Sequence, residues 1–156
     1  MENKKLIKEL ENRPLTKEEA EKKGYNIYSY DNGDYKYEDE NGIERLIRDG
    51  KELCKGNNIF SYYNGDYKYE DEKGIYHLMR DGKELCKGNF VFSYDNGDYK
   101  YEDEKGIYHL IRDGKELCKG SYVYSFENGD YDYEDKDDIH YCRVIDGYVW
   151  ERKEEW

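Results

Sequence analysis

The chain repeats itself with a period of 32 residues, and this feature limits its possible folds more than any other. Four copies align without gaps over most of their length, and they begin at Tyr28, Phe60, Phe92 and Tyr124. Two columns of identical residues mark the register: Ser29, Ser61, Ser93 and Ser125, and Cys54, Cys86 and Cys118. A fixed period of this length is typical of repeat architectures, in which each unit buries its apolar face against the next one.

The second and third copies are almost the same, whereas the fourth has diverged. Copies two and three differ at only four positions, Tyr63/Asp95, Met79/Ile111, Asn89/Ser121 and Phe90/Tyr122, which indicates recent duplication. The fourth copy keeps the run from Asn128 to Asp135 but loses the Lys-Glu-Leu-Cys-Lys-Gly block. It also carries one inserted residue between Ile139 and the Asp146-Gly147 turn.

Turn signals divide each copy into four short segments. In the first copy they are Asn32-Gly33, Asn41-Gly42, Asp49-Gly50 and Gly56-Asn57. Asn-Gly and Asp-Gly favour tight hairpins, because both central positions of a type I′ turn require φ > 0. The runs between these signals predict four strands and leave no room for a helix: Asn26–Tyr30, Asp34–Asp39, Ile43–Arg48 and Lys51–Lys55. We therefore expect a mainly β protein made of four antiparallel β-meander repeats.

The meanders could be arranged in two ways, either stacked as an open array or closed into a four-bladed propeller. In the run Ile75–Arg80 apolar residues occupy both faces, which predicts a strand packed between two layers. The end copies differ from the middle ones: Glu44-Arg45 replaces Tyr76-His77, and the fourth copy ends with Tyr148-Val149-Trp150 and Trp156. Atypical ends are expected of an open array, whose terminal units face water, so we favour the array.

The residues before the repeats differ in kind and predict a separate cap. Leu6, Ile7 and Leu10 fit one side of a short helix, Thr16 followed by Glu19 reads as a capping box, and Gly24 is a helix stop. We expect residues 1–24 to form a helical N-terminal cap and residues 25–156 to form the β domain. Its repeats would span residues 28–59, 60–91, 92–123 and 124–156.

Net charge and aromatic content limit the classes of protein and of binding partner that fit this sequence. The formal net charge of −12 opposes direct binding to nucleic acid or to an anionic membrane. Aliphatic residues are scarce, so the 20 tyrosines must supply a thin aromatic core. With no apolar stretch long enough to span a membrane and no signal-peptide run at the start, we expect a cytoplasmic protein with reduced thiols.

The stretch Gly106-Ile107-Tyr108-His109-Leu110-Ile111-Arg112-Asp113-Gly114-Lys115-Glu116-Leu117 resembles the core of bacterial WG (KWG) β-repeats. Those typically read Gly-Lys-Trp/Tyr-Gly-Leu-Ile-Asp-x-x-Gly-Lys-Glu-Val, although Tyr-His or Glu-Arg stands here in place of the naming Trp-Gly pair. The resemblance covers residues 25–156. It implies an all-β repeat protein with a binding function, and it brings no catalytic residues.

The chemistry-bearing residues do not predict a metal, a cofactor or a catalytic site. The string Asp31-Asn32-Gly33-Asp34 with Glu38-Asp39-Glu40 lacks EF-hand spacing and reads as a solvated hairpin. His77, His109 and His140 lack the spacing of a zinc site. Nothing beside Cys142 would activate a nucleophile. Near-identical repeats also generate like sites, whereas acid–base catalysis needs an unlike pair.

Two tyrosine columns and the aspartate before them survive in all four copies. They form either an aromatic ladder in the core or an exposed aromatic stripe beside a row of carboxylates. On the second interpretation the candidate binding face is Asp34, Tyr35, Tyr37, Asp66, Tyr67, Tyr69, Asp98, Tyr99, Tyr101, Asp130, Tyr131 and Tyr133.

A protein-binding repeat module is the function that these features favour. A regular row of carboxylates would fit a basic groove that normally holds phosphates, as in an acidic inhibitor (an immunity protein or a phage-type antagonist) of a nucleic-acid-handling protein. The alternative is a carbohydrate-binding repeat protein that uses tyrosine faces and Asp/Asn hydrogen bonds. Unpaired sheet edges would also allow a homodimer.

Overall fold

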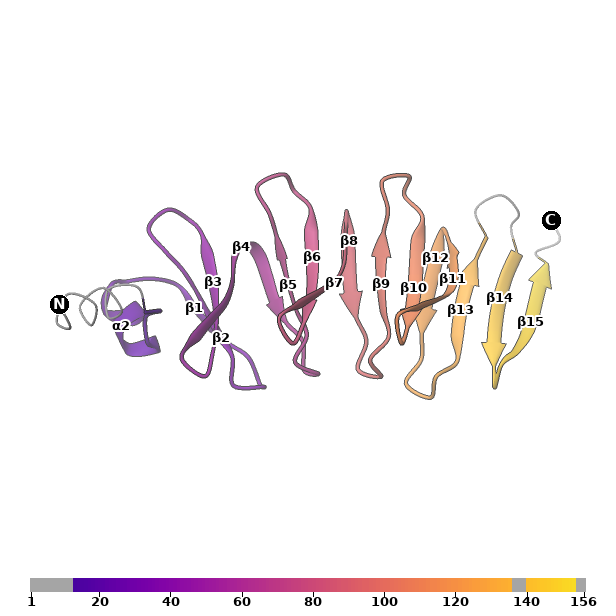
Figure 1. Ribbon diagram of the computed structural model, residues 1–156, viewed down its shortest axis with the longest axis horizontal. Coiled ribbons are helices and arrows are strands. Elements are labelled where there is room, and N and C mark those ends of the chain that lie inside the picture. The colour runs from indigo at the N-terminus through magenta and orange to yellow at the C-terminus, as the bar shows by residue number, and fades with distance from the viewer. Residues whose placement is uncertain (1–12, 136–139, 154–156) are drawn as a thin grey trace.

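The repeats form four small antiparallel meanders that follow one another along the long axis (Figure 1). We call each meander a sheet, although the first two are joined through one long shared strand. The structure, a computed structural model, describes residues 13–135 and 140–153. The first sheet comprises β1 (Ile27–Ser29), β2 (Tyr35–Glu38), β3 (Glu44–Arg48) and the start of β4 (Lys51–Ser61). The second comprises the end of β4, β5 (Tyr67–Glu70), β6 (Tyr76–Arg80) and β7 (Lys83–Gly88).

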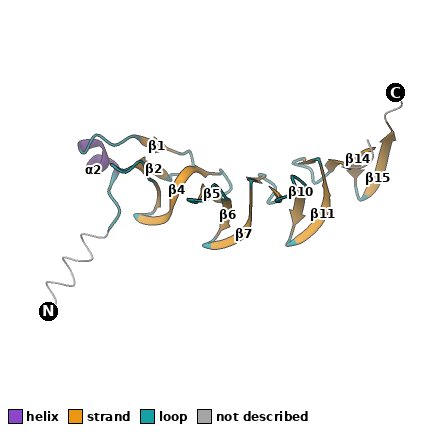
Figure 2. Ribbon diagram, turned by 90° about the horizontal axis from the view of Figure 1, so that it is seen from above, coloured by secondary structure: helices purple, strands orange, loops and turns teal. Residues whose placement is uncertain are grey.

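The third and fourth sheets repeat the same meander. The third comprises β8 (Phe90–Ser93), β9 (Tyr99–Glu102), β10 (Tyr108–Arg112) and β11 (Lys115–Gly120). The fourth comprises β12 (Tyr122–Ser125), β13 (Tyr131–Glu134), β14 (His140–Ile145) and β15 (Tyr148–Lys153). Among the described residues no pairing joins the first sheet to the last, so the predicted open array is confirmed (Figure 2).

The predicted hairpins are present, with two kinds of turn. At Asp49-Gly50 both residues have positive φ (51° and 74°), as a type I′ turn requires. At Asn32-Gly33 only the glycine has positive φ (94°), and the Asn32 side chain accepts a hydrogen bond from the Asp34 N–H at 2.9 Å. The Asn-Gly turns are therefore wider loops, stabilised by the asparagine side chain.

The predicted fourth turn, at Gly56-Asn57, is wrong. The chain does not reverse there, because β4 runs through both residues from the first sheet into the second. At Gly88 and Gly120 one sheet likewise passes almost directly into the next. A Cβ atom at Gly120 would lie 1.9 Å from the carbonyl oxygen of Glu134, so these glycines allow the close approach of two backbones.

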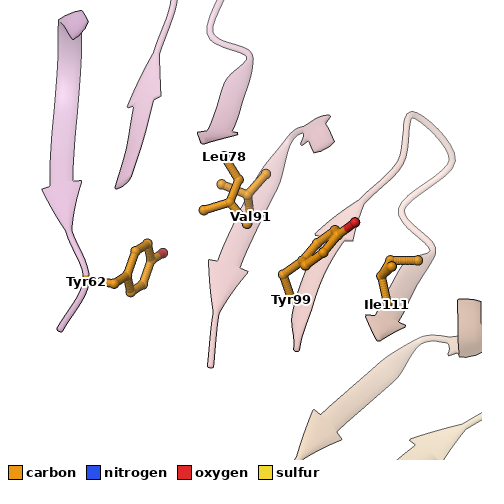
Figure 3. Packing of buried hydrophobic residues seen from close by; sticks show 5 residues of the cluster. All are labelled: Tyr62, Leu78, Val91, Tyr99 and Ile111. Atoms are coloured by element: carbon orange, nitrogen blue, oxygen red, sulfur yellow. The ribbon is translucent and has the colours of Figure 1, made fainter. Parts of the chain in front are cut away.

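The core lies between the sheets rather than inside any one of them. Tyr62 and Leu78 of the second sheet pack on Val91, Tyr99 and Ile111 of the third (Figure 3). Leu78 and Val91 have no exposed surface. The second and third sheets are thus buried on both faces, as the apolar pattern on both sides of β6 predicts.

A short helix covers the outer face of the first sheet. Helix α2 (Lys17–Lys22) begins at the N-cap Thr16, whose hydroxyl accepts a hydrogen bond from the Glu19 N–H, as predicted. Gly24 follows its end with φ of 78°. Ala20 of the helix is fully buried against Tyr37 and Ile47. The predicted helix at Leu6, Ile7 and Leu10 lies outside the described residues, as does Trp156.

Among the described residues no sheet follows the fourth one, and the outer face of this sheet is polar at its centre. In the third sheet Lys100 stands opposite Leu110, which is fully buried by the fourth sheet. The equivalent cross-strand pair of the fourth sheet is Asp132 and Arg143, joined by hydrogen bonds of 2.8 Å and 3.1 Å. The ion pair of Asp132 and Arg143 thus replaces the apolar leucine on which a further sheet would pack, as expected at the end of a stack.

Replacing Gly120 with alanine tests the close backbone approach at a junction. We expect the substitution to lower the free energy of unfolding by about 1–3 kcal/mol, because the added methyl group forces the third and fourth sheets apart. Urea denaturation would measure the loss. The exposed neighbour Lys119 provides the control, Lys119→Ala, and an equal loss in both variants would contradict the role of Gly120.

Candidate functional site

The aspartates of the predicted acidic face are buried at the junctions between sheets. Asp66 has 2% of its surface exposed, and its carboxylate accepts two hydrogen bonds from Arg80, at 2.9 Å and 2.7 Å. It also accepts one from the hydroxyl of Ser93 in the next sheet, at 2.6 Å. Arg80 donates further to the carbonyl of Gly97 at 2.9 Å, and Asn64 donates to Ser93 at 2.8 Å.

These bonds tie each sheet to the next one, and we call the set the junction staple. Equivalent staples are formed by Asp34, Arg48 and Ser61, and by Asp98, Arg112 and Ser125. Asp130 is half-buried and lacks the equivalent, since Ile145 takes the place of the arginine after the inserted residue. The prediction that the first three aspartates face a partner is therefore corrected: they bind arginine inside the protein.

The predicted tyrosine columns also lie in or near the core. Tyr67 and Tyr99 are 3% and 7% exposed, while their equivalents Tyr35 and Tyr131 are half-buried. Tyr37 is buried under helix α2. The other members of the second column are half-buried: Tyr69, Tyr101 and Tyr133. Of the two interpretations, the aromatic ladder in the core describes these residues.

A different set of aromatic side chains forms a row along the array, in which Tyr62 and Tyr94 are buried and other rings reach the surface. We call it the aromatic row, and it consists of Tyr28, Tyr30, Phe60, Tyr62, Phe92, Tyr94, Tyr124 and Phe126. Each ring meets the next edge to face, with centroid separations between 4.8 Å and 5.7 Å. The row lies at the first strands of the four sheets, and its outer rings are open to solvent: Tyr28 is 57% exposed and Phe60 44%.

An open groove follows this row past the last three sheets. It has a volume of about 770 Å³ and is lined by Phe60, Tyr62, Tyr63, Phe92, Ser93, Tyr94, Asp95, Asn96, Tyr124, Ser125, Phe126, Glu127 and Asn128. A smaller hollow of about 200 Å³ continues it beside the first sheet. Phe60 and Tyr63 border both hollows, and Tyr63 is 79% exposed.

The sequence contains a signal for this row, which the search for alternation missed. In every copy the register serine stands between two aromatic residues, as in Tyr28-Ser29-Tyr30. The serine and the rings then point to opposite sides of the strand, with Ser61 buried in the junction staple and Phe60 in the groove.

Two lysines pack against rings of the aromatic row from within the protein. The Lys100 Nζ atom lies 5.8 Å and 5.5 Å from the ring centroids of Phe92 and Tyr94. The equivalent Lys68 lies 5.8 Å from the ring of Tyr62. Desolvation lowers the pKa of both lysines. The rings of the row thus already accept cations on one side.

On the third strands of the second and third sheets, β6 and β10, two histidines are clamped between carboxylates. Nε2 of His77 lies 2.8 Å from Asp71, Nδ1 contacts Glu84, and the ring stacks on Tyr69. His109 has the same contacts with Asp103 and Glu116 in the third sheet, and in the first sheet Arg45 fills the slot between Asp39 and Glu52. The carboxylates lie at opposite ring nitrogens, so the clamp holds a cationic side chain and does not converge on a metal. Within the described ranges no group of three or more His, Cys, Asp or Glu residues could hold a metal ion.

The four cysteines are free thiols that form no disulfide bonds. Burial raises the pKa of Cys54, Cys86 and Cys118 to about 12, so these thiols stay protonated at neutral pH. Cys142 is a free and buried thiol as well.

Comparisons with known proteins identify no family for this chain. No protein-family model matches the chain, and no curated protein sequence matches it. Among solved structures it is similar to the C-terminal WD40 domain of Sif2, with 14% identity and a TM-score of 0.42 over 78% of this chain and 43% of that one. It is also similar to the WD40 β-propeller domain of Doa1, with 14% identity and a TM-score of 0.35 over 81% of this chain and 52% of that one. The chain thus spans about half the length of each. In the part of the chain that the structure describes, no helix is long and apolar enough to cross a membrane.

Substituting Asp66 with asparagine tests the junction staple. We expect the free energy of unfolding to fall by on the order of 3 kcal/mol, because the change removes the charge that faces Arg80 in a buried site. Chemical denaturation would measure the change. The matched control is Asp130→Asn at the equivalent position of the fourth sheet, where we expect little effect, and similar losses at both positions would contradict the staple.

The histidine clamps predict that stability decreases as pH rises above neutrality. Burial by itself would lower the pKa of His77 and His109, but the hydrogen bonds that each ring donates to its two carboxylates outweigh burial and raise the pKa. A raised pKa stabilises the fold fully below about 6.5, and this contribution disappears as pH rises through the folded-state value. We expect a loss of roughly 1 kcal/mol or less for these partly exposed pairs, measured by urea denaturation from pH 6 to pH 9.

The first sheet provides the control for this pH dependence. The double variant His77→Arg and His109→Arg copies the Arg45 arrangement, so its stability should stay level over the same range. At the acidic end the pKa of Asp103, lowered to about 2 mainly by its hydrogen bond with His109, predicts a separate loss below about pH 4. An unchanged slope in the arginine variant would rule out the clamps as its cause.

Proposed function

We propose that this protein is a non-enzymatic repeat module that binds a partner protein along the aromatic groove. The observation that carries the proposal is the aromatic row, whose outer rings stay exposed although the chain has few apolar side chains to bury. Tyrosine and phenylalanine supply large contact areas at little entropic cost, which is why they are enriched at protein interfaces. The open array also leaves this groove accessible along its whole length.

The partner's contact surface is expected to be basic. The net charge of −12 and the exposed carboxylates Asp95 and Glu127 in the groove favour a cationic partner and speed its association. An acidic inhibitor of a basic, nucleic-acid-handling protein, in a reducing compartment such as the cytoplasm, is the most specific form of this proposal. The resemblance of Gly106–Leu117 to bacterial WG repeats agrees with a binding role.

Carbohydrate binding is less well supported by the groove. Sugars need fixed polar groups beside the rings, but the Asn96 side chain in the groove already donates to Ser125 and to the carbonyl of Phe126, at 2.7 Å and 2.9 Å. Its carbonyl oxygen accepts from the Asp98 N–H. This amide is used to hold the sheets together.

Strand β15 offers a second contact, through which two copies would form a homodimer. It is the last strand of the fourth sheet, and Tyr148 and Trp150 are 74% and 65% exposed. An exposed apolar edge strand favours pairing with another strand. This contact is separate from the groove, so it provides a control for the groove itself.

The double variant Tyr63→Ala and Tyr124→Ala tests binding through the groove. We expect it to weaken capture of a partner from host lysate at least about tenfold, because exposed aromatic anchors dominate interface energies. The measurement is affinity capture at stepped salt concentrations, with mass spectrometry to identify the partner. Substituting the buried Asp34, Asp66 and Asp98 would test folding instead of binding.

The matched control removes two exposed aromatic residues elsewhere, Tyr148→Ala and Trp150→Ala. It should capture the partner as the natural protein does, while any self-association, followed by analytical ultracentrifugation, decreases. If the groove variant captures the partner unchanged, binding through the groove is excluded.

A further inference from the structure

The groove has the charge and the chemistry of a site for cationic side chains. Three exposed carboxylates line the two hollows at equivalent positions of the first, third and fourth copies: Asp31, Asp95 and Glu127. The second copy has Tyr63 at this position. Among the described residues that line the two hollows there is no lysine, arginine or histidine. A guanidinium or ammonium group would meet an aromatic ring and a carboxylate together at three of the four positions.

These positions recur with the spacing of the stacked sheets. From Phe92 to Tyr94 the ring centroids are 4.9 Å apart, and from Tyr94 to Tyr124 they are 5.6 Å apart. Equivalent rings of successive sheets are therefore separated by about 10 Å or less, the spacing expected of sheets packed face to face. The same limit holds from Phe60 to Phe92, where the two separations are 4.9 Å and 5.6 Å.

A bound segment that contacts the groove at every sheet must present a side chain to it once per sheet spacing, about every 10 Å. A polyproline II helix has three residues per turn and rises about 3.1 Å per residue, so its side chains recur on one side every ~9 Å. An extended β-strand advances a similar distance in three residues, but its third side chain then points to the opposite side. The polyproline II form therefore matches the sheet spacing with one side chain for each sheet.

An α-helix is the competing form for the bound segment, because its seventh residue would also recur near 10 Å along the groove. The helical form is therefore included in the test below.

We infer that the groove binds a polyproline II segment of the partner that carries arginine or lysine at every third position, except opposite Tyr63. Numbered along the groove, positions 1, 7 and 10 of such a segment are basic and face Asp31, Asp95 and Glu127. Position 4 is apolar and packs on Tyr63. A polyproline II chain is already ordered before binding, so it loses little entropy on the rings. This inference rests on the proposed function and specifies the partner's sequence pattern.

Two labelled proline-rich peptides of identical composition test the spacing. One carries arginine at positions 1, 7 and 10 with leucine at position 4, and the other carries the three arginines side by side. We expect the first to bind at least about tenfold more tightly in fluorescence anisotropy at low salt, with the affinity decreasing as salt is added. Equal affinities would overturn the inference, and so would tighter binding of a helical peptide with arginine at every seventh position.

Two substitutions assign the positions within the groove. Tyr63→Asp converts the second copy to the residue of the third, so the fold tolerates it, and it should shift the preference to a peptide with arginine at position 4 as well. Asp95→Asn with Glu127→Gln should weaken the first peptide about tenfold. Its control, Asp113→Asn with Glu104→Gln, removes the same charge from exposed positions outside the groove and should leave binding unchanged. Equal weakening by both pairs would overturn the assigned contacts.

The outcomes also separate this inference from the proposed function. If neither peptide binds while Tyr63→Ala with Tyr124→Ala still weakens capture of the partner, the pattern is wrong and the groove remains the binding site. If capture survives that double variant, the proposed function itself is wrong.

Discussion

The junction staple is the interaction on which the rest of the structure depends. Each sheet is small, and only a few aliphatic side chains and tyrosines are buried against its neighbour, so apolar contacts alone leave the position of one sheet on the next poorly specified. Asp66, Arg80 and Ser93 remove that freedom with short, directional bonds, and the arginine also holds the next turn through the carbonyl of Gly97. The aromatic row is continuous only because these bonds fix the sheets in register.

Much of the fold follows from local signals in the sequence. The period gives the number of sheets, the Asn-Gly and Asp-Gly pairs locate the hairpins, and Thr16 and Gly24 bound the helix. These signals act within a few residues, where backbone geometry and side-chain caps determine the outcome. The divergence of the end copies predicts the open array, because only terminal units face water. The exchange of Lys100 and Leu110 for Asp132 and Arg143 is how the last sheet meets that condition.

The site was harder to predict, because it depends on which face of each strand meets a neighbouring sheet. Alternation separates the two faces of a strand, but here both are covered, so Asp34 and Tyr35 read as an exposed pair although the aspartate is buried. Its partner Arg48 lies fourteen residues along the chain, and Ser61 belongs to the next sheet. The predicted turn at Gly56 failed for a related reason. The glycine is needed for its close approach to the Glu70 carbonyl, and this contact exists only after the sheets stack.

Because the second and third copies are almost identical, the length of the array can change by whole copies. Each presents the same face to the sheet that follows and accepts the same face from the sheet before, so a further copy inserted between them would meet compatible surfaces on both sides. Every insertion would lengthen the groove by one sheet spacing of about 10 Å and leave both end caps untouched. Duplication or loss of a whole unit is thus a single genetic step that changes how long a segment the protein can measure.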